Sequence, residues 1–318
     1  MGSAVRAGGV ALGAAAAVGA AALAWGVFVE RTRWTVRREV VPVLPPGSRS
    51  ITVLHFSDLH MAPWQEGKQE FIRSLVRYEP DLIVDTGDDL GHVDGIEGIE
   101  AAYAPFRGVP GVFAHGSNDY VGPLFKNPLA YLARASKAPG RRGVQLDTAR
   151  LDRFLGDDLG WLDLGNHARA VEIRGTRLEL FGTADAHHRR DDVPAMRREL
   201  ATLRQEVRWT DGSGDEVVRV GVTHAPYRKI LDVLVDEGAE LIFAGHTHGG
   251  QVRIPGMPAL TANCDLPRAQ ASGLSQWMHE DRIAYLEVSA GLGTSIYAPV
   301  RFACPPEAIV LTLVPRAA

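Results

Sequence analysis

Residues 51–60 read ITVLHFSDLH, residues 82–88 read LIVDTGD and residues 111–119 read GVFAHGSND. Each stretch is a short apolar run that ends in a polar cluster, and near-continuous apolar runs are typical of buried strands in a parallel sheet. Between the first two runs, the segment 67–78 places its apolar residues on one helical face. Strand, helix and strand in succession predict βαβ units, and therefore an α/β fold with an inner parallel sheet.

The second half of the chain adds apolar runs that also predict strands. They occupy residues 169–173, 178–181, 217–223, 241–244, 283–288 and 308–313. Arg174 and Gly175 separate the first two of these runs, and this short connection is typical of a β-hairpin turn.

Polar side chains follow each of the first three strands and recur after two later ones. Because the carboxyl ends of parallel strands meet in one crevice, these side chains are expected to converge. In an extended segment, residues i and i+2 point to the same side, which pairs Asp58 with His60 and His246 with His248. The predicted ligands of this group are Asp58, His60, Asp88, Asn118, His224, His246 and His248.

These ligands are sufficient for two adjacent divalent metal ions that share one bridging carboxylate. Imidazole and carboxylate donors without thiolate favour Mn, Fe or Zn. The glycines beside the ligands are expected to let the backbone turn sharply there. They are Gly87, Gly116, Gly245, Gly249 and Gly250.

The ordered set Asp58-x-His60, Gly87-Asp88, Gly116-Ser117-Asn118-Asp119, His224 and Gly245-His246-x-His248 resembles the calcineurin-like metallophosphoesterases. The stretches GHTHGGQVRIPG (245–256), SAGLGTS (289–295) and PVRFACPPE (299–307) are similar to a bacterial subgroup associated with the membrane or envelope. The resemblance covers about residues 50–315. It implies a four-layer αββα sandwich with two mixed β-sheets, and a hydrolase that acts on phosphomonoesters or phosphodiesters.

The resemblance also implies how the ligands are divided. Asp58, His60 and His248 are expected to hold one metal ion. Asn118, His224 and His246 are expected to hold the other, with Asp88 as the bridge. A bridging hydroxide then attacks phosphorus in line with the leaving alkoxide, while the metals neutralise charge on the phosphoryl oxygens. Of this set, the catalytic group is predicted to be Asp88, Asn118 and His224, together with Asp119.

One motif departs from the family. The family reads Gly-Asn-His followed by an acidic residue, with Asn as a ligand and His at the leaving group, whereas residues 116–119 read Gly-Ser-Asn-Asp. Either Asn118 or Ser117 is the ligand, and Asn118 is favoured because an amide oxygen is a better donor than a neutral hydroxyl. In both cases the catalytic His is missing. Leaving-group protonation then falls to Asp119, to another histidine such as His115 or His187, or to solvent.

Residues 8–29 carry no charge and are rich in Ala and Gly. Their length suits a bilayer core of about 30 Å, which predicts an N-terminal hydrophobic anchor helix and a membrane-anchored protein with a single N-terminal span. A cleaved signal peptide and a buried Ala-rich helix are the alternatives. The expected division is an anchor or signal segment at 1–32 and a metallophosphoesterase domain at 33–318.

The side of the membrane is left open by the basic residues after this segment. Four arginines within residues 31–38 favour a cytosolic domain by the positive-inside rule. However, residues 33–43 also have the texture of a strand, in which case these arginines belong to the fold. An anchor beside the catalytic domain would favour a lipid-linked or envelope phosphoester as the substrate, by location alone.

Composition narrows the remaining classes of protein. The net charge of -4 gives no support for nucleic acid as a partner. Cys264 and Cys304 form no CxxC pair, so a thiolate zinc site is not expected and two free thiols are. The pair His187-His188 is interpreted as part of a solvated loop. The runner-up function is a binding module that keeps the fold without turnover, and the missing catalytic His is the point in its favour.

Overall fold

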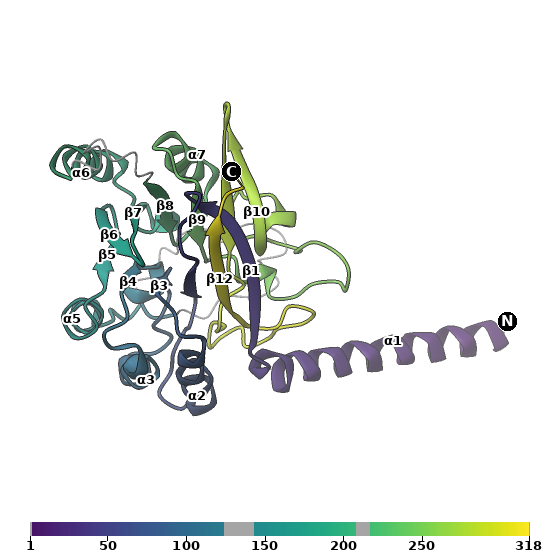
Figure 1. The fold of residues 1–318 in the computed structure, drawn as a ribbon. Coiled ribbons are helices and arrows are strands. Elements are labelled where there is room, and N and C mark those ends of the chain that lie inside the picture. Colours follow the sequence, from purple (N-terminus) through teal and green to yellow (C-terminus); the bar gives the residue numbers. More distant parts are fainter. Residues whose placement is uncertain (1, 124–142, 208–216, 318) are drawn as a thin grey trace.

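The computed structural model describes residues 2–123, 143–207 and 217–317. Two six-stranded sheets face each other in it (Figure 1). In the first sheet, β12 pairs antiparallel with β2, and the other neighbours are parallel. Its strands, in spatial order, are β1 (Thr35–Leu44), β12 (Glu307–Pro315), β2 (Ile51–Phe56), β3 (Leu82–Asp85), β4 (Gly111–Phe113) and β5 (Leu162–Asp163).

The second sheet is also mixed. Its outer pairs β10–β11 and β7–β6 are antiparallel, and its inner pairs are parallel. Arg174 and Gly175 both have positive φ between β6 and β7, so the predicted hairpin turn is confirmed. The strands, in spatial order, are β10 (Gly273–His279), β11 (Arg282–Val288), β9 (Leu241–Ala244), β8 (Val218–Thr223), β7 (Thr176–Thr183) and β6 (Ala168–Ile173).

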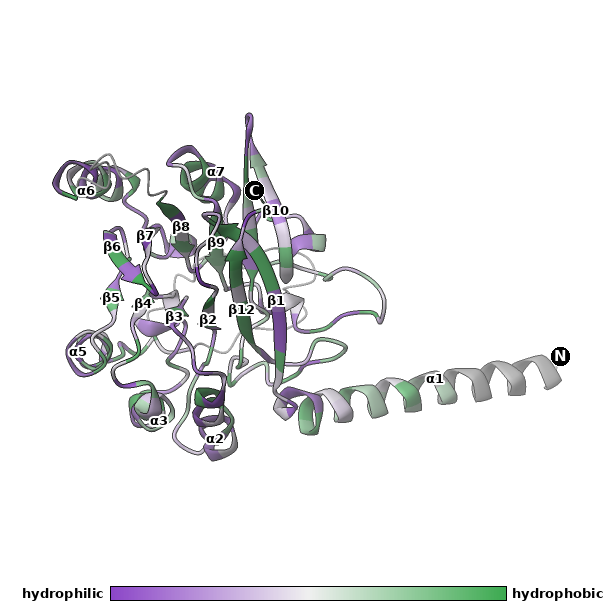
Figure 2. Cartoon of the chain, viewed as in Figure 1, coloured by the Kyte–Doolittle hydropathy of each residue, from purple (hydrophilic) through white to green (hydrophobic). Residues whose placement is uncertain are grey.

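Side chains alternate across the first sheet and so divide two cores. In β2, Leu54 and Phe56 pack with residues of the outer helices, whereas Val53 packs with the second sheet. The core between the sheets also contains Val220 and Phe243 from β8 and β9. Figure 2 shows these two strands and β12 as predominantly hydrophobic, which explains why they read as continuous apolar runs.

Helices cover the outer face of each sheet. On the first sheet they are α2 (Glu66–Ser74), α3 (Gly95–Tyr103) and α5 (Thr148–Arg153), and on the second they are α6 (Val193–Glu206) and α7 (Arg228–Asp236). Ile72 and Ile99 pack under the first sheet, and Leu200 and Leu234 pack under the second. The order of layers is therefore helix, sheet, sheet, helix, and the predicted αββα sandwich with two mixed sheets is confirmed.

The N-terminal helix α1 (Gly2–Phe28) extends away from the sheets in Figure 1. Among the described residues, however, no helix combines the length and apolarity that crossing a bilayer requires. A run of Ala and Gly presents little apolar side-chain surface per residue, which limits the gain from transfer into lipid. The prediction of an anchor helix with a single N-terminal span, and of a membrane-anchored localisation, is therefore wrong.

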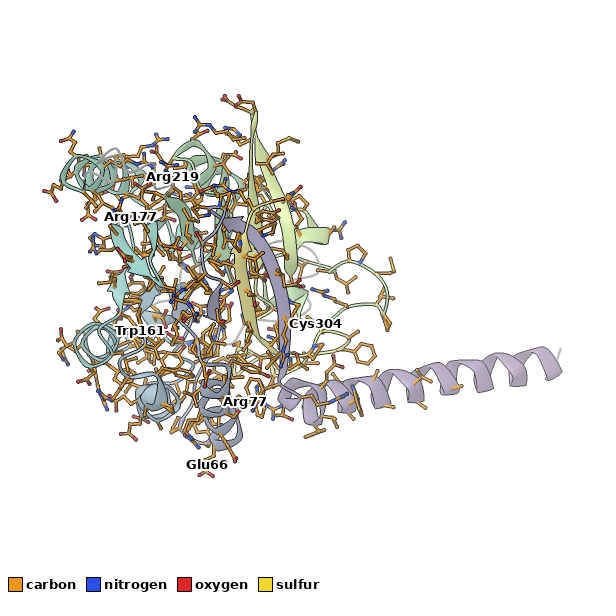
Figure 3. The ribbon with its side chains drawn as sticks, in the orientation of Figure 1. Glu66, Arg77, Trp161, Arg177, Arg219 and Cys304 are labelled. Carbon is orange, nitrogen blue, oxygen red and sulfur yellow. The ribbon has the colours of Figure 1, made fainter. Side chains whose placement is uncertain are left out.

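The end of α1 instead contacts the folded part of the chain. The carbonyl of Gly26 accepts a hydrogen bond from the backbone N–H of Arg301, 3.1 Å away. The buried side chain of Glu30 accepts one from the backbone of Cys304 at 2.7 Å and one from the indole of Trp25 at 2.9 Å. Cys304 is labelled in Figure 3, near the start of β1. These contacts cross the expected boundary between residues 32 and 33.

Strand β1 occupies most of the candidate strand at residues 33–43. Arg37, within it, forms ion pairs with Glu287 at 2.5 Å and with Glu307 at 3.1 Å. Both partners are well buried, so this arginine joins the two sheets rather than lying free beside a membrane. The two cysteines are unpaired, as expected.

Candidate metal centre

The polar clusters lie where the sequence places them, at the carboxyl ends of strands, but their backbone is not extended. Five predicted ligands have left-handed backbone, with φ of 50° at Asp58, 43° at His60, 58° at Asp88, 67° at His246 and 50° at His248. Residues other than glycine seldom adopt this conformation, and it concentrates at functional sites. Side chains i and i+2 therefore converge because the chain coils at these positions, not because it is extended.

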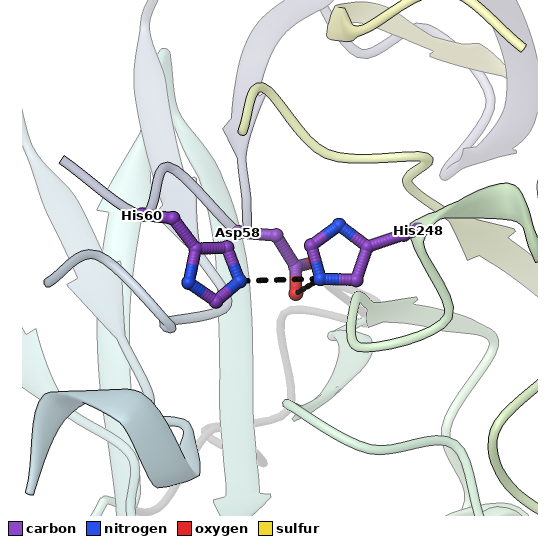
Figure 4. A group of neighbouring side chains, drawn as sticks. All are labelled: Asp58, His60 and His248. Carbon is purple, nitrogen blue, oxygen red and sulfur yellow. Dashed lines mark hydrogen bonds and ion pairs between the residues drawn. The ribbon is translucent and has the colours of Figure 1, made fainter. Parts of the chain in front are cut away.

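Asp58, His60 and His248 form what we call the first half-site (Figure 4). The Nε2 atoms of His60 and His248 lie 3.2 Å apart. Oδ1 of Asp58 lies 3.3 Å from Nε2 of His248 and is a buried oxygen with no hydrogen-bond partner among the described residues. Three ligand atoms from two distant parts of the chain thus face one point.

These separations fit a shared cation. Ligand bonds of about 2.0–2.1 Å in a tetrahedral site place the ligand atoms about 3.3 Å from one another. A proton shared between the two imidazoles would satisfy one pair of atoms but would leave the orphaned oxygen of Asp58 unexplained. The residues present therefore fit a metal ion.

Asp88, Asn118, His224 and His246 form what we call the second half-site. Oδ2 of Asp88 lies 3.5 Å from Nε2 of His224 and 3.7 Å from Nε2 of His60, so this carboxylate stands between the two half-sites. Ligand atoms of Asp58, Asp88 and His224 also lie close enough together to hold an ion. Both carboxylates are therefore placed where they can serve more than one cation.

The tautomer of His224 is fixed by the backbone. Its Nδ1–H donates to the carbonyl of Thr86 at 2.7 Å, which leaves the lone pair of Nε2 on the side of Asp88. That Nε2 atom is buried and has no hydrogen-bond partner among the described residues. A backbone carbonyl behind a histidine in this way is the usual support of a metal ligand.

His246 is the predicted ligand that lies least close to the others. Its ring centre is 5.2 Å from that of His224, but its Nε2 lies 3.3 Å from the carbonyl of Asn263. It belongs to neither group of converging ligand atoms. The sequence contains no motif that marks Asn263 as its neighbour.

The departing motif at 116–119 places Asn118, and not Ser117, against the bridging position. The amide Nδ2 of Asn118 donates to Oδ2 of Asp88 at 2.6 Å, and its backbone N–H donates to Oδ1 at 2.7 Å. The amide oxygen Oδ1 is the ligand atom that Asn118 retains when its nitrogen is used in this way.

Asp119 is engaged differently from a catalytic acid. Its buried carboxylate accepts hydrogen bonds from four backbone N–H groups, at distances between 2.7 and 3.1 Å. The donors are Gly116, Asp88, Asp89 and Leu90. This side chain therefore ties the loop after β4 to the loop after β3, and so positions Asn118 relative to Asp88.

Burial and charge set the protonation of the ligands. Burial lowers the pKa of His60 to about 4, and that of His246 and His248 to about 3, so these imidazoles are neutral at pH 7. Burial would also lower the pKa of His224, but the carboxylates of Asp88 and Asp58 raise it well above its usual range. The pocket attracts one positive charge to His224, and a divalent cation would replace that proton.

Two of the predicted glycines are required for space rather than for a turn. A Cβ on Gly116 would lie 2.2 Å from Oδ1 of Asp88, and one on Gly245 would lie 1.9 Å from Oγ of Ser57. Neither has positive φ, whereas Gly87, Gly249 and Gly250 do and turn as expected.

The sequence profile of calcineurin-like phosphoesterases matches residues 51–250, which contain every predicted ligand. The chain belongs to this family. The metallophosphoesterase YkuE of Bacillus subtilis (strain 168) is 23% identical over 90% of this chain and 86% of its own length. A metallophosphoesterase of Aquifex aeolicus (strain VF5) is also 23% identical, over 90% of this chain and 92% of its own.

Among solved structures, this metallophosphoesterase resembles the protein TT1561 of Thermus thermophilus. The two are 12% identical with a TM-score of 0.42, and the match covers 77% of this chain and 91% of the other.

The sequence of this metallophosphoesterase misplaces one segment beside the metal centre. The loop after β7 carries His187, whose ring centre lies 4.6 Å from that of His246 and whose Nδ1 lies 2.8 Å from the hydroxyl of Tyr227. Asp185 is buried and caps the same loop through the backbone N–H groups of His187 and His188. The string HHRRDD predicts a solvated loop, because nothing in it shows which strand end it faces.

A second support is Arg301, which is fully buried. Its Nη2 donates to the carbonyls of Ala290, Gly291 and Gly293, at distances between 2.6 and 3.1 Å. The N–H of Gly293 in turn donates to the carbonyl of Asp58 at 2.7 Å. This arginine of the metallophosphoesterase therefore holds a loop against the first half-site, a role that the motif PVRFACPPE does not reveal by itself.

Proposed function

We propose that this protein hydrolyses phosphomonoesters or phosphodiesters with two divalent metal ions. The observation that carries the proposal is the convergence of orphaned ligand atoms, Oδ1 of Asp58 and Nε2 of His224, on either side of the carboxylate of Asp88. Family membership supports the same reaction class. The donor set contains nitrogen and oxygen without sulfur, which suits Mn, Fe or Zn.

In this proposal the first half-site holds one metal ion through Asp58, His60 and His248. The second half-site holds the other through Asn118, His224 and His246, with Asp88 as the bridge. When bound, the two ions supply Lewis-acid activation of water and neutralise charge on the phosphoryl oxygens. His246 must turn away from Asn263 to take part, because its Nε2 is 3.3 Å from that carbonyl.

The surrounding residues orient this site. Asp119 fixes the two loops that carry Asp88 and Asn118, and Thr86 fixes the ring of His224. We assign Asp119 this positioning role, because its carboxylate already accepts four backbone hydrogen bonds. His115 is also occupied, with Nε2 at 2.6 Å from Asp152.

Leaving-group protonation is therefore assigned to solvent. His187 is the remaining candidate near the site, but burial lowers its pKa to about 4, so it carries no spare proton at neutral pH. A solvent proton is sufficient for a leaving group of low basicity, such as a phenolate. A lipid-linked substrate is not part of the proposal, because that idea depended on the membrane anchor.

A non-catalytic metal-binding module remains the second candidate. Two observations favour it: the family's catalytic His is absent from residues 116–119, and His246 contacts Asn263 rather than the other ligands. Such a module would bind metal ions and phosphoesters without turnover.

The two candidates are separated by a hydrolysis assay. Protein loaded with Mn²⁺ is mixed with bis-p-nitrophenyl phosphate, beside the variants Asp88→Ala and His246→Ala. We expect steady release of p-nitrophenolate from the wild type and a loss of more than about 100-fold in both variants, beyond the 10–100-fold typical of a supporting residue. His279→Ala is the matched control, since this histidine lies on the surface at the end of β10. Equal rates in all four proteins would end the enzyme interpretation.

A further inference from the structure

The loop at residues 185–190 forms one rim of the second half-site. At one end of it, the ring of His187 lies against His246, with ring centres 4.6 Å apart. At the other end, the guanidinium carbon of Arg190 lies 3.6 Å from the ring centre of Tyr120. Tyr120 comes two residues after Asn118. The loop therefore reaches from one predicted ligand of the second half-site to the neighbourhood of another.

The backbone of Arg190 is fixed on both sides. Its N–H donates to the carbonyl of Asp185 at 2.9 Å, and its carbonyl accepts from Nδ2 of Asn166 at 3.0 Å. The Oδ1 atom of Asn166 accepts from the backbone of Ala184 and Asp192, which lie on either side of the loop. An arginine held at its main chain and stacked on an aromatic ring loses little freedom when it binds a ligand.

The guanidinium of Arg190 has no carboxylate partner among the described residues, although its side chain is exposed. The nearby acidic side chains are engaged elsewhere: Asp152 contacts His115 at 2.6 Å, and Asp163 accepts from the backbone of Gly165 at 2.7 Å. Stacking uses the face of a guanidinium and leaves the N–H donors at its edge free. Those donors match the oxygens of a phosphate or carboxylate in a bidentate way.

We propose that Arg190, stacked on Tyr120, is a specificity-determining residue that binds a second anionic group of the substrate beyond the scissile phosphate. This inference rests on the proposed function and names its substrate class: phosphoesters that carry another phosphate or a carboxylate on the same molecule. The two metal ions neutralise the scissile phosphate, and Arg190 supplies the positive charge that a second anion needs.

The test compares two ligands of the same length, propyl phosphate and 1,3-propanediol bisphosphate. Each is used as a competitive inhibitor of bis-p-nitrophenyl phosphate hydrolysis with Mn²⁺ in excess, and each is titrated calorimetrically into metal-loaded protein. We expect the bisphosphate to bind the wild type about tenfold more tightly or better, which is the effect of one charge-assisted hydrogen-bonding pair. In Arg190→Gln this preference should fall to about one.

Arg189→Gln is the matched control, because Arg189 is exposed on the same loop and its loss removes the same charge. It should keep the preference of the wild type. Tyr120→Leu removes the stacking surface and should lower the preference, whereas Tyr120→Phe should retain it. A preference unchanged in Arg190→Gln, equally lost in Arg189→Gln, or absent from the wild type would overturn the proposal. Replacing the second phosphate by a carboxylate, with phosphoglycolate against ethyl phosphate, distinguishes which anion is preferred.

Calorimetry separates this inference from the proposed function. If bis-p-nitrophenyl phosphate is not hydrolysed but the preference persists in binding and disappears in Arg190→Gln, the subsite stands and the hydrolase proposal fails. If hydrolysis is normal and the preference is absent, the hydrolase proposal stands and the subsite fails.

Discussion

In the first half-site, the Nε2 atoms of His60 and His248 already face each other at 3.2 Å with Oδ1 of Asp58 beside them. In the second half-site, His224 is aimed at Asp88, but His246 contacts Asn263 and the amide of Asn118 covers the carboxylate of Asp88. The first half-site therefore needs little rearrangement to bind a cation, whereas the second must turn at least one ring.

The difference follows from what supports each half-site. The first is held by the loop at 291–293, whose N–H groups donate to the carbonyls of Ser57 and Asp58, and this loop is held in turn by buried Arg301. The second depends on loops tied together by Asp119 and on the rim at 185–190. Preorganised ligands bind more tightly because less is lost in ordering them. We expect the first half-site to fill first.

The largest effect is expected where the two half-sites share a ligand. Asp58→Asn keeps the size of the side chain but removes the carboxylate that belongs to both groups of converging ligand atoms. Hydrolysis of bis-p-nitrophenyl phosphate should fall by more than about 100-fold, and both metal ions should be lost after dialysis. Plasma mass spectrometry of the dialysed protein measures the metal content. Retention of either ion at wild-type affinity would contradict the shared position of Asp58.

The order of filling is tested by removing one histidine from each half-site. His246→Ala should still bind about one Co²⁺ per chain tightly, because the ligands of the first half-site are intact. His248→Ala should lose the tighter of the two binding steps. Titration followed by the visible absorption of Co²⁺ counts the ions and reports tetrahedral coordination. If His248→Ala kept the tighter step and His246→Ala lost it, the comparison between the half-sites would be reversed.

Arg301 should support the first half-site without touching a metal ion. Arg301→Met removes the donors for the carbonyls of Ala290, Gly291 and Gly293. The affinity of the tighter metal step should fall by about tenfold or more, as for other outer supports of ligands. The free energy of unfolding should fall by about 1–3 kcal/mol.

Arg197→Met provides the control for Arg301→Met, because Arg197 forms a surface ion pair with Glu237 on the far helix α6. It should change the free energy of unfolding by less than about 1 kcal/mol and leave metal binding alone. A loss of stability in Arg301→Met with unchanged affinity at the tighter step would show that Arg301 supports the fold but not the half-site.

The sequence predicts the layers of the fold because buried parallel strands must be apolar on both faces. It misses β10 and β5, since β10 is a half-exposed outer strand and β5 has only two residues. Residues around position 56 can be assigned to a strand from composition alone, but the left-handed backbone at Asp58 and His60 cannot. That backbone results from contacts with the chain near Gly293, which lies far away in the sequence.

The neighbours of the ligands are similarly hidden. Asn263 and Arg190 lie in segments with no motif, and only the folded chain brings them beside His246 and Tyr120. The membrane prediction fails for the opposite reason, because an uncharged run is taken as sufficient without weighing how little apolar surface Ala and Gly provide. Residue types therefore indicate chemistry, whereas its orientation depends on contacts between distant segments.

The smallest expected effect concerns His115, which supports the second half-site through Asp119. Burial would lower the pKa of His115, but Asp119 and Asp152 raise it from 6.5 to about 10. A histidine whose pKa is raised on folding stabilises the protein below its unfolded pKa, and this stabilisation is lost as the pH rises through the folded pKa. The free energy of unfolding lost in His115→Gln should therefore shrink steadily between about pH 7 and pH 10.

His55→Gln is the control for this pH dependence. Burial lowers the pKa of His55 to about 3, so its charge is the same in the folded and unfolded chain above about pH 7. Urea unfolding of the wild type and both variants at a series of pH values measures the two differences. The difference for His55→Gln should stay flat over this range while that for His115→Gln declines. Parallel curves for the two variants would show that His115 is neutral in the folded protein, and that the second half-site rests on the backbone hydrogen bonds of Asp119 alone.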